Sequence, residues 1–340
     1  MTRPTHILYT LLLSISLVQL RAQDIHFSQF YNAPLQLNPA QAGLFSEDIR
    51  FIGNSRLQWA SVPVNYLTFA GSYDQKYIPK KAQRGVFVNG ATFSYDHSGD
   101  SKMTTTQLAS NVAYIKRLGE LNLLSIGLQA GFRHRGFNYN GLTFDKQFNG
   151  ERFNSSASTG ENFQNQGFWG IDFGIGINYR FQLKDKRTRL DFGAAIYHPH
   201  EPRAEFLTNS LRLPSRKTFY VLTNVKATKK LDIIVYLAGQ NQGPYNEFLF
   251  NNLYRIYLKQ TKHETTAIQF GAQYRISERR DAVIPTIEFL TNRYRLGLSY
   301  DVTLSQFNIA NNFRGGPEVS FQKLITNVKK VKTSKACPIF

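Results

Sequence analysis

The chain has 340 residues, of which 42% are hydrophobic and 14% aromatic, and its formal net charge is +18. Its one cysteine, Cys337, excludes an intramolecular disulfide and a zinc site built from several cysteines. A basic charge of this size favours anionic partners: lipopolysaccharide phosphates, peptidoglycan carboxylates or an acidic protein. Beyond the first residues no segment approaches ~20 consecutive apolar residues, which argues against an inner-membrane helical protein.

Residues 1–22 have the pattern of a signal peptide. A short polar start with Arg3 and His6 precedes an apolar run from Ile7 to Leu20, and the small Ala22 offers a cleavage point. The apolar run is too short for a membrane-spanning helix. We therefore expect export of the mature chain, which argues against a nucleic-acid partner.

Residues 23–46 form a segment of a different kind. Pro34 and Pro39 exclude an interior strand, yet the segment is too apolar for a solvated tail. Asn38, Pro39 and Gly43 carry the signals of a short helical turn, which are a capping residue, a proline at the first position and a terminal glycine. Two interpretations stay open: the segment plugs the periplasmic mouth of a barrel, or it docks a partner.

The clearest strand lies at Trp169 to Phe181, where apolar residues alternate without a break with small, polar or charged ones. At ~3.3 Å per residue and a tilt of ~45°, a strand of this length spans ~30 Å, about the hydrocarbon thickness of a bilayer. Trp169 stands at one end and Tyr179 and Phe181 at the other, where aromatic girdles lie in membrane barrels. Only a closed barrel pairs the backbone of such a strand on both sides.

Similar alternating runs continue along residues 47–325 and predict an all-β, antiparallel outer-membrane barrel of about fourteen strands. The strands are expected near 50–59, 67–74, 87–96, 107–117, 124–135, 169–181, 190–196, 216–228, 230–240, 246–259, 264–276, 282–292, 293–304 and 317–325. Two long connections, 136–167 and 199–215, are expected outside the cell, because extracellular loops of such barrels are longer than periplasmic turns. Residues 326–340 are expected to form a basic C-terminal tail.

Candidates for catalysis or metal binding are weak. His198, His200 and Glu201 form the most ligand-like cluster, but Pro199 loosens its geometry and a catalytic zinc needs three protein ligands. A strand-to-loop corner explains this cluster better. Asp96, His97 and Asp100 suggest acid–base chemistry, yet such residues are ordinary at polar barrel rims. We expect no enzyme, no metal and no cofactor.

Several arginines fall on the faces expected to line the lumen. Either they pair with Asp172, Asp191 and Asp301 inside a filled barrel, or they form a basic pore that favours anions. The second interpretation makes the protein an outer-membrane porin. The arginines concerned are Arg133, Arg135, Arg180, Arg189, Arg275 and Arg295.

The run QDIHFSQFYNAPLQLNPAQAG, residues 23–43, resembles the start of the mature chain in the PorP/SprF family of the type IX secretion system. Further landmarks of that family are similar to GLTFDKQ, GIDFGIGINY, YHPHEP, RLGLSYDVTLS, GGPEVSF and the terminal Cys337-Pro338-x-Phe340. They are spread over the whole mature chain. The resemblance departs from the family at Gly-Pro-Glu, where Gly-aromatic-Glu is more usual, and in its long basic stretch from Lys323 to Lys335.

The resemblance implies a non-enzymatic outer-membrane protein of Bacteroidota that supports type IX secretion. It implies contact with outer-membrane lipid and with periplasmic secretion components, either a lipoprotein ring or a peptidoglycan-linked protein. It also implies export or surface anchoring of large secreted proteins, such as the adhesins of gliding motility. The residues expected to contact a partner are Phe27, Phe30, Tyr31, Asn32, Pro34, Asn38 and Pro39.

Overall fold

The computed structural model describes most of the chain between residues 24 and 326. The described ranges are 24–58, 66–77, 85–99, 102–138, 142–160, 167–185, 187–203, 212–261, 264–277, 281–305 and 313–326. The expected signal peptide, Asp100, most of the expected basic tail and Cys337 lie outside them. None of the helices in the described ranges is long and apolar enough to cross a membrane.

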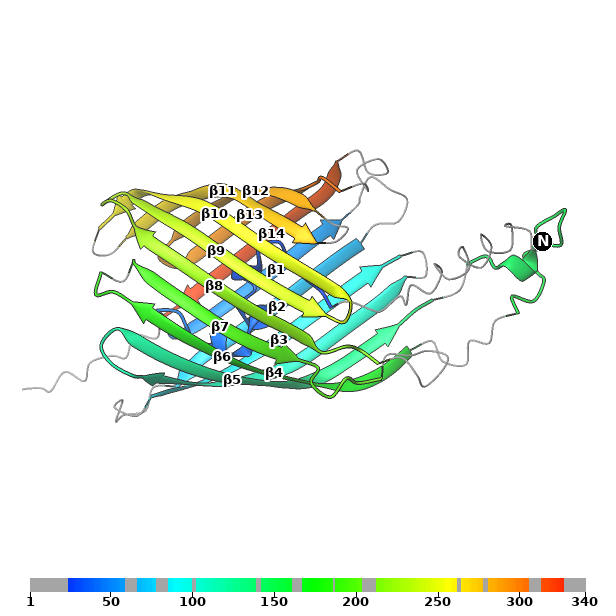
Figure 1. Ribbon diagram of the computed structural model, residues 1–340, viewed down its shortest axis with the longest axis horizontal. Coiled ribbons are helices and arrows are strands. Elements are labelled where there is room, and N and C mark those ends of the chain that lie inside the picture. Colours follow the sequence, from blue (N-terminus) through cyan, green and yellow to red (C-terminus); the bar gives the residue numbers. More distant parts are fainter. Residues whose placement is uncertain are drawn as a thin grey trace, which may run out of the picture.

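Fourteen antiparallel strands form one closed barrel, in which every strand pairs with its neighbours in sequence and β1 closes the ring against β14 (Figure 1). The expected strand number and antiparallel topology are therefore confirmed. The strands are β1 (Ile49–Gln58), β2 (Tyr66–Tyr77), β3 (Val86–Ser98), β4 (Met103–Arg117), β5 (Asn122–Gly136), β6 (Gly167–Gln182), β7 (Arg189–Tyr197), β8 (Arg216–Lys226), β9 (Leu231–Gln242), β10 (Tyr245–Gln260), β11 (Thr265–Ser277), β12 (Ala282–Thr291), β13 (Tyr294–Thr303) and β14 (Arg314–Ile325).

The two faces of the wall follow the alternation in the sequence. On β6, Trp169 is 75% exposed and Ile171, Phe173 and Ile175 follow it on the outer surface, while Asp172 is buried on the inner one. The other strands also have apolar residues outside; their inner faces are polar or small in part and carry large apolar residues such as Val88, Ile234 and Leu253 elsewhere. This arrangement is inside-out relative to a soluble protein, and it suits a wall that stands in a bilayer.

The two ends of the barrel differ in the length of their connections. We call the end where β1 begins and β14 finishes the turn end. Its connections are short, as between β4 and β5 (118–121) or β12 and β13 (292–293). The opposite end, the loop end, carries the long connections 137–166 and 198–215. By the rule for bacterial barrels, the turn end is periplasmic and the loop end extracellular.

The N-terminal segment lies inside the barrel, where Figure 1 shows it in dark blue. It contains three short helices: η1 (Phe30–Asn32), α2 (Pro34–Leu37) and η2 (Pro39–Gln41). Its apolar side chains form three clusters with the inner wall, in which Phe30, Leu35 and Phe27 are each at most 5% exposed. Residues 24–44, which we call the lumen segment, therefore supply much of the apolar core of the barrel.

Candidate functional site

The lumen segment runs along the barrel from the loop end to the turn end. At the loop end, the Asp24 backbone N–H donates to Gln242 Oε1 at 2.8 Å, and Gln242 is the last residue of β9. At the turn end, Arg180 Nη1 donates to the Leu44 carbonyl at 3.0 Å. The segment thus runs through the barrel from one end to the other, whereas one of the two interpretations left open by the sequence had it plug the periplasmic mouth.

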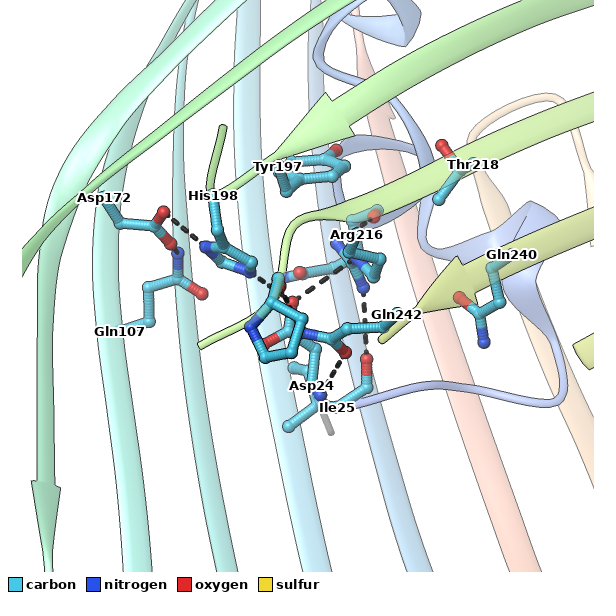
Figure 2. Close-up of polar contacts among 12 residues, drawn as sticks. Asp24, Ile25, Gln107, Asp172, Tyr197, His198, Arg216, Thr218, Gln240 and Gln242 are labelled. Carbon is cyan, nitrogen blue, oxygen red and sulfur yellow. Dashed lines mark hydrogen bonds and ion pairs between the residues drawn. The ribbon is translucent and has the colours of Figure 1, made fainter. Parts of the chain in front are cut away.

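Asp24 anchors the first residues of the segment through three cationic side chains. Its Oδ1 lies 2.9 Å from Arg133 Nη2. Its Oδ2 lies 2.5 Å from His198 Nε2 and 3.4 Å from Arg216 Nε (Figure 2). On its other side His198 Nδ1 lies 2.5 Å from Asp172 Oδ1. We call these five residues the Asp24 anchor.

Opposite charges within the anchor favour the ionised forms of Asp24 and His198. Burial alone would raise the pKa of Asp24, but the positive charges of Arg133, His198 and Arg216 hold it well below its ordinary value of 3.8. Burial lowers the pKa of His198, but the charge of Asp24 and hydrogen bonds to Asp172 and Asp24 bring the net value above the ordinary 6.5. At neutral pH Asp24 is therefore ionised and paired.

A second group of contacts holds the first half of the lumen segment against β12 and β14. The Glu318 carboxylate accepts the backbone N–H groups of Ser28 at 2.8 Å and of Gln29 at 2.7 Å. The Tyr31 hydroxyl and the Asn32 amide each donate to Glu288 Oε1 at 2.8 Å. Both glutamates are at most 3% exposed, so each is a buried polar group that needs these donors.

Asn38 fixes the second half of the segment against β6 and β8. Its Oδ1 accepts the Ala40 backbone N–H at 2.7 Å and so caps η2, the helical turn expected at this position. Its Nδ2 donates to the Ile177 carbonyl at 2.9 Å and to the Tyr220 hydroxyl at 3.0 Å. The wall makes room with glycine: a Cβ on Gly127 would lie 2.3 Å from the Ala40 nitrogen.

Comparison with family models decides which family this is. The model of the type IX secretion system membrane protein PorP/SprF matches residues 19–321. The chain belongs to the PorP/SprF family. As a family member with a barrel of this kind it is an outer-membrane component of type IX secretion. A search of curated proteins found no match.

Solved structures match this PorP/SprF protein only at low identity. The toluene transporter TbuX of Ralstonia pickettii shares 11% identity at a TM-score of 0.48, over 86% of this chain and 94% of its own. The monoaromatic hydrocarbon channel CymD shares 9% at 0.48, over 87% and 93%. BamA from Haemophilus ducreyi shares 10% at 0.40, over 81% and 69%. Similarity this remote says nothing about what the present chain binds.

All seven residues expected to contact a partner are buried in the lumen of this PorP/SprF protein. Those residues are Phe27, Phe30, Tyr31, Asn32, Pro34, Asn38 and Pro39. They pack on the inner wall or bond to it, so a partner reaches them only after the lumen segment leaves the barrel. Their role in partner binding stays a prediction.

The structure separates the ligand-like histidines. β7 ends at Tyr197, and the backbone turns at His198 with φ of 55°. His198 is 1% exposed and belongs to the Asp24 anchor, whereas the exposed His200 contacts the Ile171 carbonyl. In the described ranges, no three His, Cys, Asp or Glu residues are grouped as metal ligands. The backbone turn lies at the strand-to-loop corner expected from the sequence, and it gives the two histidines different surroundings.

Asp96 and His97 are not a catalytic pair. Being successive residues of β3, they point to opposite faces of the wall. Asp96 accepts a hydrogen bond from the Thr68 hydroxyl at 2.6 Å. This contact makes Asp96 part of the polar inner surface.

Of the two interpretations of the lumen arginines, pairing with aspartates holds for four of the six. Arg180 lies 2.6 Å from Asp191, and Arg275 lies 2.5 Å from Asp301. The same pattern joins Arg133 to Asp172 at 3.6 Å and Arg189 to Asp191 at 3.9 Å. Arg135 Nη2 instead lies 2.9 Å from Met103 Sδ, and Arg295 Nε lies 3.9 Å from Glu288 Oε2. Other inward residues were missed although the alternation places them on the inner face: Arg50, Arg56, Asp74, Glu288 and Glu318.

Proposed function

We propose that this PorP/SprF protein is a non-enzymatic scaffold of the type IX system that supports export or surface anchoring of secreted proteins, such as gliding adhesins. Its barrel provides a fixed platform in the outer membrane. The secreted protein meets the loop end, and the periplasmic machinery meets the turn end. A lipoprotein ring or a peptidoglycan-linked protein is the periplasmic partner in this proposal.

The observation that carries the proposal is the filled lumen. The lumen segment occupies the barrel from the Asp24 anchor to Leu44, and two of the spaces beside it hold only about 30 and 20 Å³. A space of ~10–15 Å³ is about what one water molecule requires. A barrel closed in this way supports a structural role better than passage of solutes or of a polypeptide.

The ion pairs of the lumen support the same proposal. A porin that favours anions presents unpaired cations to its channel. Here Arg180 and Arg275 lie within 2.6 Å of aspartate oxygens. Their charge is already balanced inside the protein, which weakens the porin alternative.

Deleting the gene and measuring the proteins of the medium, cell surface and periplasm tests the proposal. Loss of many secreted proteins identifies a core secretion component, and loss of one large surface protein identifies a dedicated anchor. Both results support a secretion scaffold. An unchanged secretome combined with altered solute uptake would contradict the scaffold and favour the porin.

Complementation with a variant tests whether the seven residues expected to contact a partner bind the periplasmic machinery. A chain with Phe27, Phe30 and Tyr31 changed to alanine is first checked for a folded barrel by heat-modifiable mobility on a gel. Loss of co-purifying periplasmic partners from this folded variant would support a docking role for the segment. Retained partners would leave the segment with the structural role alone.

A further inference from the structure

The outer face of the barrel carries a hollow that the secretion role does not explain. It has a volume of about 980 Å³ and is lined almost entirely by apolar side chains of β5 to β11. Ligand sites in proteins usually hold ~300–1,000 Å³. The size is therefore that of a binding site, although the hollow faces the bilayer.

Strand pairing explains the position of the hollow. One row of paired residues crosses β6 to β11 on the outer face and consists of Ile177, Ala194, Phe219, Gly239, Phe248 and Ile276. Ala194 and Gly239 are the two small residues of this row. A Cβ on Gly239 would lie 2.2 Å from the Phe219 ring, whose centroid is 6.1 Å from that of Phe248. The Phe219 ring therefore lies over Gly239, and the exposed Ala194 is the small residue that lowers the floor of the hollow between Ile177 and Phe219.

The hollow runs obliquely across the membrane-facing wall. At one end Ile276 is the residue before Ser277, where β11 finishes at the loop end. At the other end Leu124 is the third residue of β5, which begins at the turn end. The strands are tilted in barrels of this kind, so a row of paired residues passes from one boundary of the bilayer toward the other.

A cation stands beside the hollow at the loop end. Lys217 is two residues before Phe219 on the same outer face of β8 and is exposed. Its ammonium group has no hydrogen bond or ion pair with the described residues. Its strand neighbour is Asn241, whose amide donates to Asn246 Oδ1 at 2.8 Å. These polar groups border an apolar surface, as headgroup contacts border acyl-chain contacts at a membrane interface.

We infer that the hollow is a binding site for a phosphate-bearing lipid of the outer leaflet, with an acyl chain against Ala194 and the Phe219 ring and a headgroup phosphate at Lys217. The surroundings at this depth are hydrocarbon, so an acyl chain fills the hollow at no cost in desolvated polar groups. An ammonium group is a strong donor to phosphate. This site is independent of the lumen segment and of the proposed role in secretion.

Native mass spectrometry of the purified full-length chain, released from detergent, tests the site. The probes are a phosphorylated lipid A and the same lipid A with its phosphates removed. We expect the phosphorylated form to be retained and Lys217→Gln to weaken its binding about fivefold, the change that corresponds to a loss of about 1 kcal/mol. Lys217→Arg keeps the charge and is expected to restore binding.

Filling the hollow gives a second, independent readout. Ala194 faces outward, so Ala194→Leu adds an apolar side chain on the membrane side and is expected to displace the lipid. Ala91 also faces outward but lies on β3, away from the hollow, and Ala91→Leu is expected to leave binding unchanged. Both variants are compared with the original chain by heat-modifiable mobility.

Three results would overturn the inference. Equal retention of the two forms of lipid A would show that the headgroup phosphate does not contribute to binding. Lys116 pairs with Leu124 at the turn end, on the side of the other leaflet. Binding that survives Lys217→Gln but is lost in Lys116→Gln would show that the bound lipid belongs to that leaflet. Release of a co-purifying membrane protein by Ala194→Leu, without any change in lipid, would make the occupant a protein segment.

Discussion

Asp24 and His198 are 174 positions apart in the chain, yet Asp24 Oδ2 lies 2.5 Å from His198 Nε2. This contact joins the start of the lumen segment to the first residue after β7. It connects the interior of the barrel to the base of the long connection 198–215 at the loop end. A conformational change in that connection can therefore displace the lumen segment through the ion pair between His198 and Asp24.

Replacing Asp24 by asparagine is expected to loosen the start of the lumen segment. The change leaves Arg133, His198 and Arg216 without their shared carboxylate, and breaking a buried ion pair costs ~3–5 kcal/mol. Limited proteolysis in detergent is expected to cut the segment near residue 24 in Asp24→Asn but not in the original chain. Glu151→Gln, an exposed change in a connection at the loop end, serves as the matched control. Equal cleavage of all three chains would refute a stabilising anchor.

The anchor is expected to have a pH window. The pKa of Asp24 is lowered, so its contribution is complete above pH 3.8 and is lost as the pH falls through the lower folded value. The pKa of His198 is raised, so its contribution is complete below pH 6.5 and is lost as the pH rises through the higher folded value. Hydrogen exchange of the peptide that begins at Asp24, corrected for its intrinsic rate, is expected to be slowest between these limits.

His198→Gln separates the two sides of that window. Glutamine has no proton to lose in this range, so the increase in exchange at alkaline pH is expected to disappear. The increase at acid pH, which comes from Asp24, is expected to remain. If the increase in exchange at alkaline pH is unchanged in the variant, a group other than His198 causes it.

Gly127→Val is expected to displace the second half of the lumen segment. The added Cβ would meet the backbone of Pro39 and Ala40 at 2.3 Å, and a backbone cannot rotate away as a flexible side chain does. Gly170→Val adds the same side chain to the inner face of β6, where nothing lies within 4 Å of the Cβ. Protease access to the segment is expected to rise in the first variant only. Similar behaviour of the two would mean that the segment fits the wall loosely.

The original chain is expected to be electrically silent in a planar bilayer because the lumen segment fills it. A chain that lacks residues 24–44 but keeps the barrel is expected to conduct ions. Neutralising Arg133 and Arg135 in that shortened chain is expected to reduce its preference for anions. Steady conductance of the original chain, unaffected by Asp24→Asn, would support the porin instead.

The strands could be predicted from the sequence because their signal is local. On β6 the alternation from Trp169 to Phe181 gives the face of each residue, and a bilayer outside makes that alternation unbroken. The same reasoning placed Arg180 and Asp191 on the inner surface, where the structure pairs them at 2.6 Å. Boundaries differ by a residue or a few, as for β14, which begins at Arg314 rather than near 317.

The site could be predicted only in part, since its contacts join distant residues. The sequence identified Asn38 as a helix cap, a contact that spans two residues. It gave no sign that Asp24 meets Arg133 or that Glu318 accepts the Gln29 backbone N–H, because no periodicity relates residues so far apart. It left the place of residues 23–46 open between a periplasmic plug and a docking segment.

By itself the sequence determined the barrel, its strand number and the side of the wall on which each strand residue lies, because all of these follow from a period of two residues along the chain. The tertiary structure decided where the lumen segment runs, which charges pair inside and where the outer face is hollow. Those features depend on closing the ring between β1 and β14, which brings side chains from opposite ends of the chain into one enclosed space.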